Sequence, residues 1–267
     1  MVFLRAIRKT KTPNDDSPYP MSTSVCRNLT RLEFTKPVTI LAGENGTGKT
    51  TLLELLALKL NAIRIDGSTM DGNPKYRLIK EAEPFFRLEM AGRPQRNFFF
   101  QAEDFSRYIS NLHQMKWEAR QALNTLEEEY ADRSGYAKSL ASMPYHRTLY
   151  EIESMYDEDL SEQSHGESFI TFFGSRIIEG GLYLLDEPEA ALSPFNQLVL
   201  LNLISEAEKQ DCQLIISTHS PIITAYPRAC IYEISDGVIK ETKYEDMEGI
   251  RLLQSFLKNK DNYLRNI

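Results

Sequence analysis

The chain has 267 residues, enough for one large α/β domain or for a core that carries a subdomain. Its apolar fraction of 42% and charged fraction of 26% are those of a globular protein rather than a disordered or fibrous one. A formal net charge of −7 disfavours a protein whose whole surface grips nucleic acid, although a local basic patch remains compatible with it.

The first hundred residues predict short strands separated by turns. Apolar, β-favouring runs predict strands at 2–7, 29–34, 38–42, 76–79, 85–90 and 98–100. A leucine-rich run over 51–60 predicts a helix that ends near Asn61. The prolines, glycines and aspartates of 11–20 and 67–74 predict loops.

Residues 104–130 show helical periodicity, because apolar side chains recur along them mostly at steps of three and four. We interpret this segment as an amphipathic helix packed on the core, with an exposed arm for a partner as the alternative. The segment 132–159 is irregular and polar and contains Gly135 and Pro144, so it predicts mobile loops and short helices.

The last hundred residues alternate between strand and helix patterns. Strands are predicted at 182–185, 214–217 and 231–234, a helix at 194–209, and a closing helix around 250–257. Such alternation predicts a largely parallel sheet and therefore an α/β fold.

Residues 43–50 match the phosphate-binding pattern G-x-x-x-x-G-K-[ST], between a predicted strand and a predicted helix. In this context backbone N–H groups and the helix N-terminus are expected to bind nucleotide phosphates. Lys49 would reach the β- and γ-phosphates, and the Thr50 hydroxyl would ligate Mg²⁺. The alternative, an ordinary glycine-rich turn, is disfavoured because loop and context agree. The expected nucleotide-binding residues are Gly43, Glu44, Asn45, Gly46, Thr47, Gly48, Lys49, Thr50 and Thr51.

Two carboxylates follow the apolar run that starts at Leu182. Because ligands of a parallel sheet lie at the carboxyl ends of its strands, we expect both acids to face the phosphates. Asp186 would hold Mg²⁺, directly or through water, and Glu187 would act as general base on the attacking water. Many strands end in acids, so this pair gains its meaning from the phosphate loop upstream.

Four further residues or segments indicate little individually, but their order along the chain is informative. Gln101 directly follows the predicted strand at 98–100, and the run 163–168 opens a helical stretch. Ala190-Ala191-Leu192-Ser193 follows the two acids, and His219 follows another strand end. A lone histidine is more often structural than catalytic, and a serine near a glycine is usually a helix cap.

In this order, over nearly the whole chain, the motifs resemble those of the ABC-type ATPases, which include transporter nucleotide-binding domains and the SMC/Rad50 branch. The amino-acid sequences of 162–168 and 184–193 resemble those of a group of small, stand-alone bacterial predicted ATPases. The resemblance implies an α/β P-loop NTPase with a mostly parallel core sheet, an antiparallel β subdomain and a helical subdomain. It further implies a single domain over 1–267, with its core in 1–101 and 180–267 and the helical, signature-bearing part in 102–179.

The resemblance also implies a mechanism in which two copies sandwich two ATP molecules head to tail. Ser164 and Gly166 of one copy would close the nucleotide on the other copy's phosphate loop. Gln101 would act at the metal or the attacking water, and His219 would contact the γ-phosphate. ATP and Mg²⁺ are the expected cofactors.

The chain also departs from the family pattern. His165 and Glu167 stand where the family signature has a glycine and a glutamine, so the resemblance assigns no role to these two residues. Tyr19 and Phe34 are the candidates for stacking on the adenine ring. These two aromatic residues do not distinguish ATP from GTP as the bound nucleotide.

The biological role stays open between three classes. One is a nucleotide-driven clamp or switch that acts on a protein effector, and another is a DNA-associated ATPase head. The third, which the acidic-strand and signature wording disfavours, is the ATP-binding subunit of a transporter. Roughly 115 residues separate Lys49 from Ser164, too few for a long coiled coil. A basic stretch is formed by Arg93, Arg96, Arg107, Lys116 and Arg120, and we interpret it as a solvated face rather than a nucleic-acid site.

The location follows from cysteines and hydropathy. Cys26, Cys212 and Cys230 are scattered, so we expect neither disulfides nor a zinc site, as in a reducing cytoplasm. The basic N-terminal residues do not form a signal peptide, and no run of about 18 apolar residues occurs. We therefore expect a cytoplasmic protein with no membrane insertion.

Overall fold

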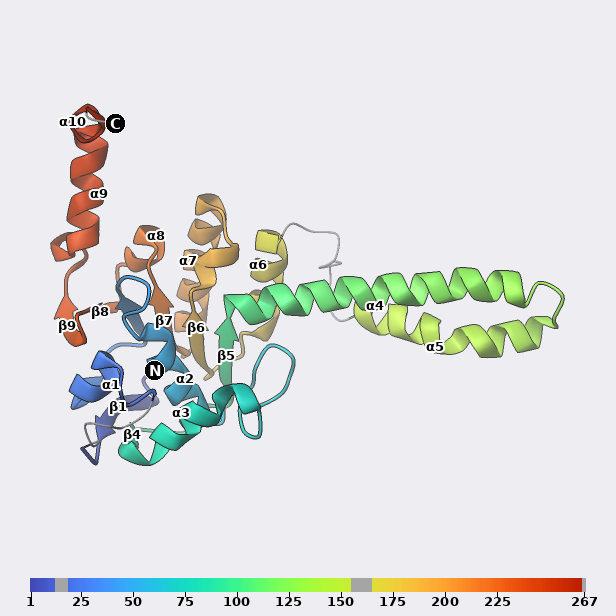
Figure 1. The fold of residues 1–267 in the computed structure, drawn as a ribbon, viewed down its shortest axis with the longest axis horizontal. Helices are drawn as coiled ribbons and strands as arrows, with labels where there is room; N and C mark the ends of the chain where they lie inside the picture. The colour runs from blue at the N-terminus through green and yellow to red at the C-terminus, as the bar shows by residue number, and fades with distance from the viewer. Residues whose placement is uncertain (13–18, 155–164, 266–267) are drawn as a thin grey trace.

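The computed structural model describes residues 1–12, 19–154 and 165–265 (Figure 1). A six-stranded sheet forms its centre, in the order β5-β6-β7-β3-β8-β9. All neighbouring pairs are parallel except β8 and β9. The strands are Asn97–Gln101 (β5), Leu182–Asp186 (β6), Gln213–Thr218 (β7), Val38–Ala42 (β3), Cys230–Ser235 (β8) and Val238–Thr242 (β9). The predicted α/β class with a mostly parallel sheet is confirmed.

The second sheet is antiparallel and has three strands in the order β2-β1-β4. Its strands span Leu4–Lys9 (β1), Arg31–Glu33 (β2) and Phe86–Met90 (β4). Segments far apart in the sequence thus form the antiparallel part that the family resemblance implies.

The central strands β3, β6 and β7 are buried along their whole length. Parallel strands covered on both faces have continuous apolar sequences, which explains why these runs were visible in the sequence. On one face, Leu184 and Ile215 join a core with the leucines of α2 (Lys49–Lys59) and the antiparallel sheet. On the other, Leu185 and Ile216 join a core formed with α6 (His165–Arg176) and α7 (Pro194–Lys209).

A helical hairpin projects from the end of β5 (Figure 1). It consists of α4 (Ala102–Glu129) and α5 (Gly135–Ser154), which pack against each other. Only the first part of α4 joins the main core, through Phe105, Ile109 and Leu112. The prediction that the whole helix packs on the core is therefore wrong for its distal half, which forms an arm.

The prediction of mobile loops and short helices over 132–159 is wrong for α5, and 155–159 lie outside the described residues. Gly135 stands at the start of α5, and Pro144 lies inside it. Both residues oppose a helix locally, but packing against α4 outweighs these local preferences.

Residues 74–85 also differ from their prediction. They form short helices, η1 (Pro74–Tyr76), α3 (Arg77–Ala82) and η2 (Glu83–Phe85), where a strand at 76–79 was predicted. The Asn73 side chain accepts a hydrogen bond from the Lys75 backbone N–H, and Pro74 follows directly. A capping asparagine followed by proline starts a helical turn.

The remaining helices are short or lie at the C-terminal end: α1 (Ser24–Asn28), η3 (Pro188–Ala191), α8 (Pro221–Thr224), η4 (Tyr244–Asp246), α9 (Glu248–Lys258) and α10 (Lys260–Leu264). The closing helix at 250–257 corresponds to α9. Neither α1 nor β9 was predicted. Within the described residues, no helix is both long and apolar enough to cross a lipid bilayer.

Candidate functional site

The register of the parallel sheet brings the predicted site residues to one edge. Gln101 on β5 lies opposite Asp186 on β6, and Asp186 lies opposite Ser217 on β7. Ala42 at the end of β3 lies opposite Thr218, and the phosphate loop follows it. Four strand ends therefore deliver the loop, the amide, the acids and His219 to the same edge.

The phosphate loop needs its glycines for backbone conformation and for space. Gly43, Gly46 and Gly48 have positive φ angles of 153°, 81° and 94°. A Cβ on Gly43 would lie 2.4 Å from the carbonyl oxygen of Ile234, so only glycine fits there. The helix α2 begins at Lys49, two residues before its predicted start, and places the loop at a helix N-terminus.

Lys49 is buried within this loop. Its Nζ donates hydrogen bonds of 2.8 Å to the carbonyl oxygens of both Gly43 and Glu44. Burial lowers the pKa of Lys49, while the nearby carboxylates of Glu187 and Asp186 act in the opposite direction. The loop thus carries a cation at its centre.

The acidic strand and the phosphate loop meet directly. The Thr50 hydroxyl donates to Asp186 Oδ1 at 3.1 Å, and Gln101 Nε2 donates to Asp186 Oδ2 at 3.3 Å. Burial raises the pKa of Asp186, and the hydrogen bonds it accepts act to lower that pKa. The Thr50 hydroxyl and the Asp186 carboxylate offer oxygen ligands of the kind that Mg²⁺ prefers, so this pair fits the predicted metal, whereas Gln101 faces Asp186 with its amide nitrogen.

The second acid, Glu187, sits in a strained conformation. Its backbone is left-handed, with φ 48° and ψ 51°, and its N–H donates to the Ser217 carbonyl oxygen at 2.9 Å. Such strain in a non-glycine residue clusters at functional sites. The Glu187 carboxylate is partly exposed, with His219 Nδ1 3.9 Å from its Oε1.

A third acid, Glu189, holds the segment that carries His219. Its buried Oε1 accepts hydrogen bonds from the Thr218 hydroxyl (2.6 Å) and from the backbone N–H groups of His219 (2.8 Å) and Ser220 (3.2 Å). His219 Nδ1 lies 3.2 Å from the same oxygen. Our sequence reasoning missed Glu189, although its place directly after the Asp-Glu-Pro turn was a usable signal.

Glu54 is another functional candidate that the sequence reasoning missed. It is buried on α2, and its Oε1 accepts a 3.3 Å hydrogen bond from Gln101 Nε2. Burial raises the pKa of Glu54 to about 7. An acid inside the leucine run of a buried helix was the signal for it.

The segment that resembles the family signature, Ser164 to Glu167, is described only in part. Ser164 lies outside the described residues, whereas Gly166 is buried and Glu167 exposed in the first turn of α6.

The two adenine-stacking candidates differ in their exposure to solvent. Phe34 is 2% exposed within the core, so that candidate is wrong. Tyr19 is 41% exposed, and its hydroxyl lies 3.1 Å from the hydroxyl of Thr51, directly after the phosphate loop.

Known proteins match this chain over most of its length. A family model described as an AAA domain matches residues 21–215. The macrolide export ATP-binding/permease protein MacB of Campylobacter jejuni is 25% identical over 248 residues, which are 89% of this chain and 36% of MacB. The chain therefore spans about a third of that relative's length.

The cobalt import ATP-binding protein CbiO of Salmonella paratyphi A is 26% identical over 213 residues, 78% of this chain and 68% of CbiO. A solved nucleotide-free ATP-binding cassette from an ABC transporter is 17% identical, with a TM-score of 0.49, over 98% of this chain and 99% of that one. Since the AAA domain model covers well over half of the sequence, the chain belongs to the family that this model describes.

Proposed function

We propose that this protein binds ATP with Mg²⁺ and hydrolyses it to ADP and phosphate. The observation that carries the proposal is the contact between Thr50 and Asp186, beside the buried cation of Lys49. The loop N–H groups and Lys49 would hold the phosphates. Thr50, Asp186 and Gln101 would hold the metal, which when bound neutralises phosphate charge.

The roles of the remaining residues follow from where they lie. Glu187 would accept the proton of the attacking water, and its strained turn keeps its carboxylate available at the site edge. His219 would contact the γ-phosphate, and Glu189 would hold the His219 backbone in place.

Calorimetry of ATP binding tests the proposal. Lys49→Ala removes the fixed cation, so no binding heat is expected. Lys80→Ala, an exposed lysine paired with Asp71, is the control and should bind ATP as the unaltered protein does. ATP binding that survives Lys49→Ala would overturn the role of the loop.

We further propose that ATP joins two copies into a homodimer, with Ser164 and Gly166 of one copy closing the other's nucleotide. Support comes from the start of α7, which follows the two acids and η3 closely in the sequence. Phe195 is 73% exposed there, and Leu198 on the same helix is also exposed. Exposed large apolar side chains next to a phosphate site suit an ATP-dependent interface.

For the biological role we favour a nucleotide-driven switch that acts on a protein effector in the cytoplasm. The arm formed by α4 and α5 carries exposed aromatic residues, with Trp117 58% and Tyr136 80% exposed. Tryptophan and tyrosine are enriched at the centres of protein interfaces. Affinity purification of the unaltered protein, compared with a form that lacks α4 and α5, would test this role. A protein that co-purifies only when the arm is present would support it.

The DNA-associated alternative has less support. Within the basic stretch, Arg107 lies 3.3 Å from Asp104. Lys116 and Arg120 lie 3.6 and 3.9 Å from Glu153. Paired cations have less free charge to offer phosphates. ATPase activity stimulated by DNA would favour this alternative, and co-fractionation with membranes would favour the transporter role that the relatives' names suggest.

A further inference from the structure

The side-chain amide of Gln101 is held from both ends. Its Nε2 donates to Glu54 and Asp186, both at 3.3 Å. Its Oε1 accepts from the Tyr76 hydroxyl at 3.1 Å and from Lys75 Nζ at 3.3 Å. The amide therefore makes four hydrogen bonds, which uses both of its N–H donors and both lone pairs of its carbonyl oxygen.

These partners fix which end of the amide faces the acidic strand. A lysine ammonium carries only donors, so the atom facing Lys75 must be the carbonyl oxygen. An ionised carboxylate carries only acceptors, so the atom facing Asp186 must be the amide nitrogen. In this arrangement Gln101 presents N–H groups to Asp186, and an amide nitrogen does not ligate Mg²⁺.

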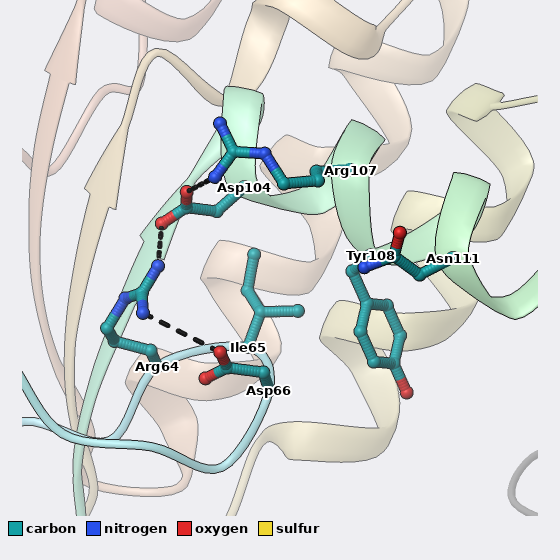
Figure 2. A pocket seen from close by; sticks show the side chains of 7 residues that line it. All are labelled: Arg64, Ile65, Asp66, Asp104, Arg107, Tyr108 and Asn111. Atoms are coloured by element: carbon teal, nitrogen blue, oxygen red, sulfur yellow. Dashed lines mark hydrogen bonds and ion pairs between the residues drawn. The ribbon is translucent and has the colours of Figure 1, made fainter.

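Lys75 and Tyr76 are themselves held in place from outside. Lys75 Nζ lies 3.8 Å from Asp104 Oδ1, and the Arg64 guanidinium stacks over the Tyr76 ring at 5.6 Å. Arg64 also pairs with Asp104 at 2.6 Å, inside the small pocket at the base of α4 that Figure 2 shows. Asp104 thus offers Lys75 a partner besides Gln101, so Lys75 can leave the neutral amide and keep its ion pair.

We propose that Lys75 and Tyr76 form a latch on Gln101, which turns its carbonyl oxygen away from Asp186 until the latch is released. They are positioning residues, because they act through Gln101 and not on the nucleotide. Release of the latch would free the Gln101 carbonyl oxygen to join Thr50 and Asp186 as a ligand of the metal. The latch rests on the proposed function, since it assumes that Asp186 and Gln101 hold a metal bound with nucleotide.

The test measures metal affinity rather than turnover. Mn²⁺ binding to the protein with a non-hydrolysable ATP analogue is followed by electron paramagnetic resonance of free Mn²⁺. Removing both donors with Lys75→Met and Tyr76→Phe should tighten Mn²⁺ binding roughly fivefold to tenfold, because the oxygen no longer has to leave two hydrogen bonds. The same two changes in a Gln101→Ala background should leave the affinity as it is in Gln101→Ala alone.

Lys80→Met is the matched control, since Lys80 lies in the same short-helix segment but pairs with Asp71. It should leave Mn²⁺ affinity unchanged. If Tyr76→Phe does not fold, Lys75→Met alone carries the test, because Lys75 is largely a surface residue. Its expected tightening is roughly threefold.

Two outcomes would overturn the latch. One is an Mn²⁺ affinity that the latch variants do not change, and the other is the same tightening in the Gln101→Ala background. Failure of the proposed function gives a different result: the unaltered protein would then bind no Mn²⁺ with the analogue, or Asp186→Asn would bind it equally well. Metal binding that depends on Asp186 but not on Lys75 or Tyr76 rejects the latch alone.

Discussion

The Thr50 hydroxyl donates a hydrogen bond of 3.1 Å to Asp186 Oδ1, across 136 positions of sequence. The contact joins the start of α2 to the end of β6, although β7 separates β3 from β6 in the sheet. It exists because the parallel register aligns the carboxyl ends of these strands. The phosphate loop and the acidic strand are therefore parts of one site.

Replacing Glu187 by glutamine should leave ATP binding intact while turnover falls. The substitution keeps the shape of the side chain but removes the base, and a general base contributes about 10²- to 10⁴-fold. Phosphate release should therefore fall at least about a hundredfold. Near-normal release, with unchanged ATP affinity in calorimetry, would remove Glu187 from this role.

Mixing two inactive variants tests whether the site is shared between copies. Ser164→Arg should spare ATP binding to the monomer yet block turnover, and Lys49→Ala should block nucleotide binding. A mixed dimer keeps one composite site free of both lesions, so part of the ATPase activity should return on mixing. If the mixture stays as inactive as its components, the two lesions act within one chain.

Glu54 makes stability depend on pH. The pKa of Glu54 is raised from 4.5 to about 7 in the folded protein. Between these two pH values the folded state therefore holds a proton that the unfolded state has lost. The free energy of unfolding is therefore unaffected by Glu54 below about pH 4.5, falls as the pH rises toward 7, and stays lower above pH 7. The shift corresponds to a penalty on the order of 3 kcal/mol, which Glu54→Gln should remove.

Urea unfolding at pH 5 and pH 8, without nucleotide and with a chelator, measures this effect. The gain in unfolding free energy of Glu54→Gln over the unaltered protein should be larger at pH 8. Glu81→Gln, an exposed residue on α3 that pairs with Arg77, should give no such difference. A gain that is equal at both pH values would contradict the account of Glu54.

The Arg64–Asp104 pair should matter far more than a surface pair. Both side chains are buried and 2.6 Å apart, and removing one partner of a buried pair leaves the other charge uncompensated. Asp104→Asn should cost about 3 kcal/mol of unfolding free energy, at the lower end of the usual range because Asp66 also lies near Arg64. Glu81→Gln should cost less than about 0.5 kcal/mol. Equal costs would show that the pair is not a buried one in solution.

The sequence predicted those elements whose local pattern agrees with their tertiary setting. The central strands are continuous apolar runs because they are covered on both faces, and the phosphate loop carries its own conformation in its glycines. α5 was not predicted, since its stability comes from packing along α4 and its own sequence contains Pro144. The Asn73-Pro74 cap was a readable helix signal that the β-favouring residues after it obscured.

Some features of the candidate site could likewise be predicted from the sequence, and others could not. Motif spacing predicted Lys49, Thr50 and Asp186, the family resemblance implied Gln101, and the structure brings all four to one edge of the sheet. The contacts that Lys75 makes with Gln101 could not be predicted, because they arise where distant segments meet in the folded chain. Whether a partner copy supplies Gly166 is likewise a property of an assembly and not of local sequence.

The most direct test of the ATP-dependent switch is the solution mass of the Glu187→Gln protein by light scattering, with Mg²⁺ and either ATP or ADP. Slow hydrolysis in this variant should hold the ATP-bound state long enough to measure. The account predicts a dimer with ATP and a monomer with ADP. A monomer in both states, at a concentration where calorimetry shows ATP fully bound, would contradict it.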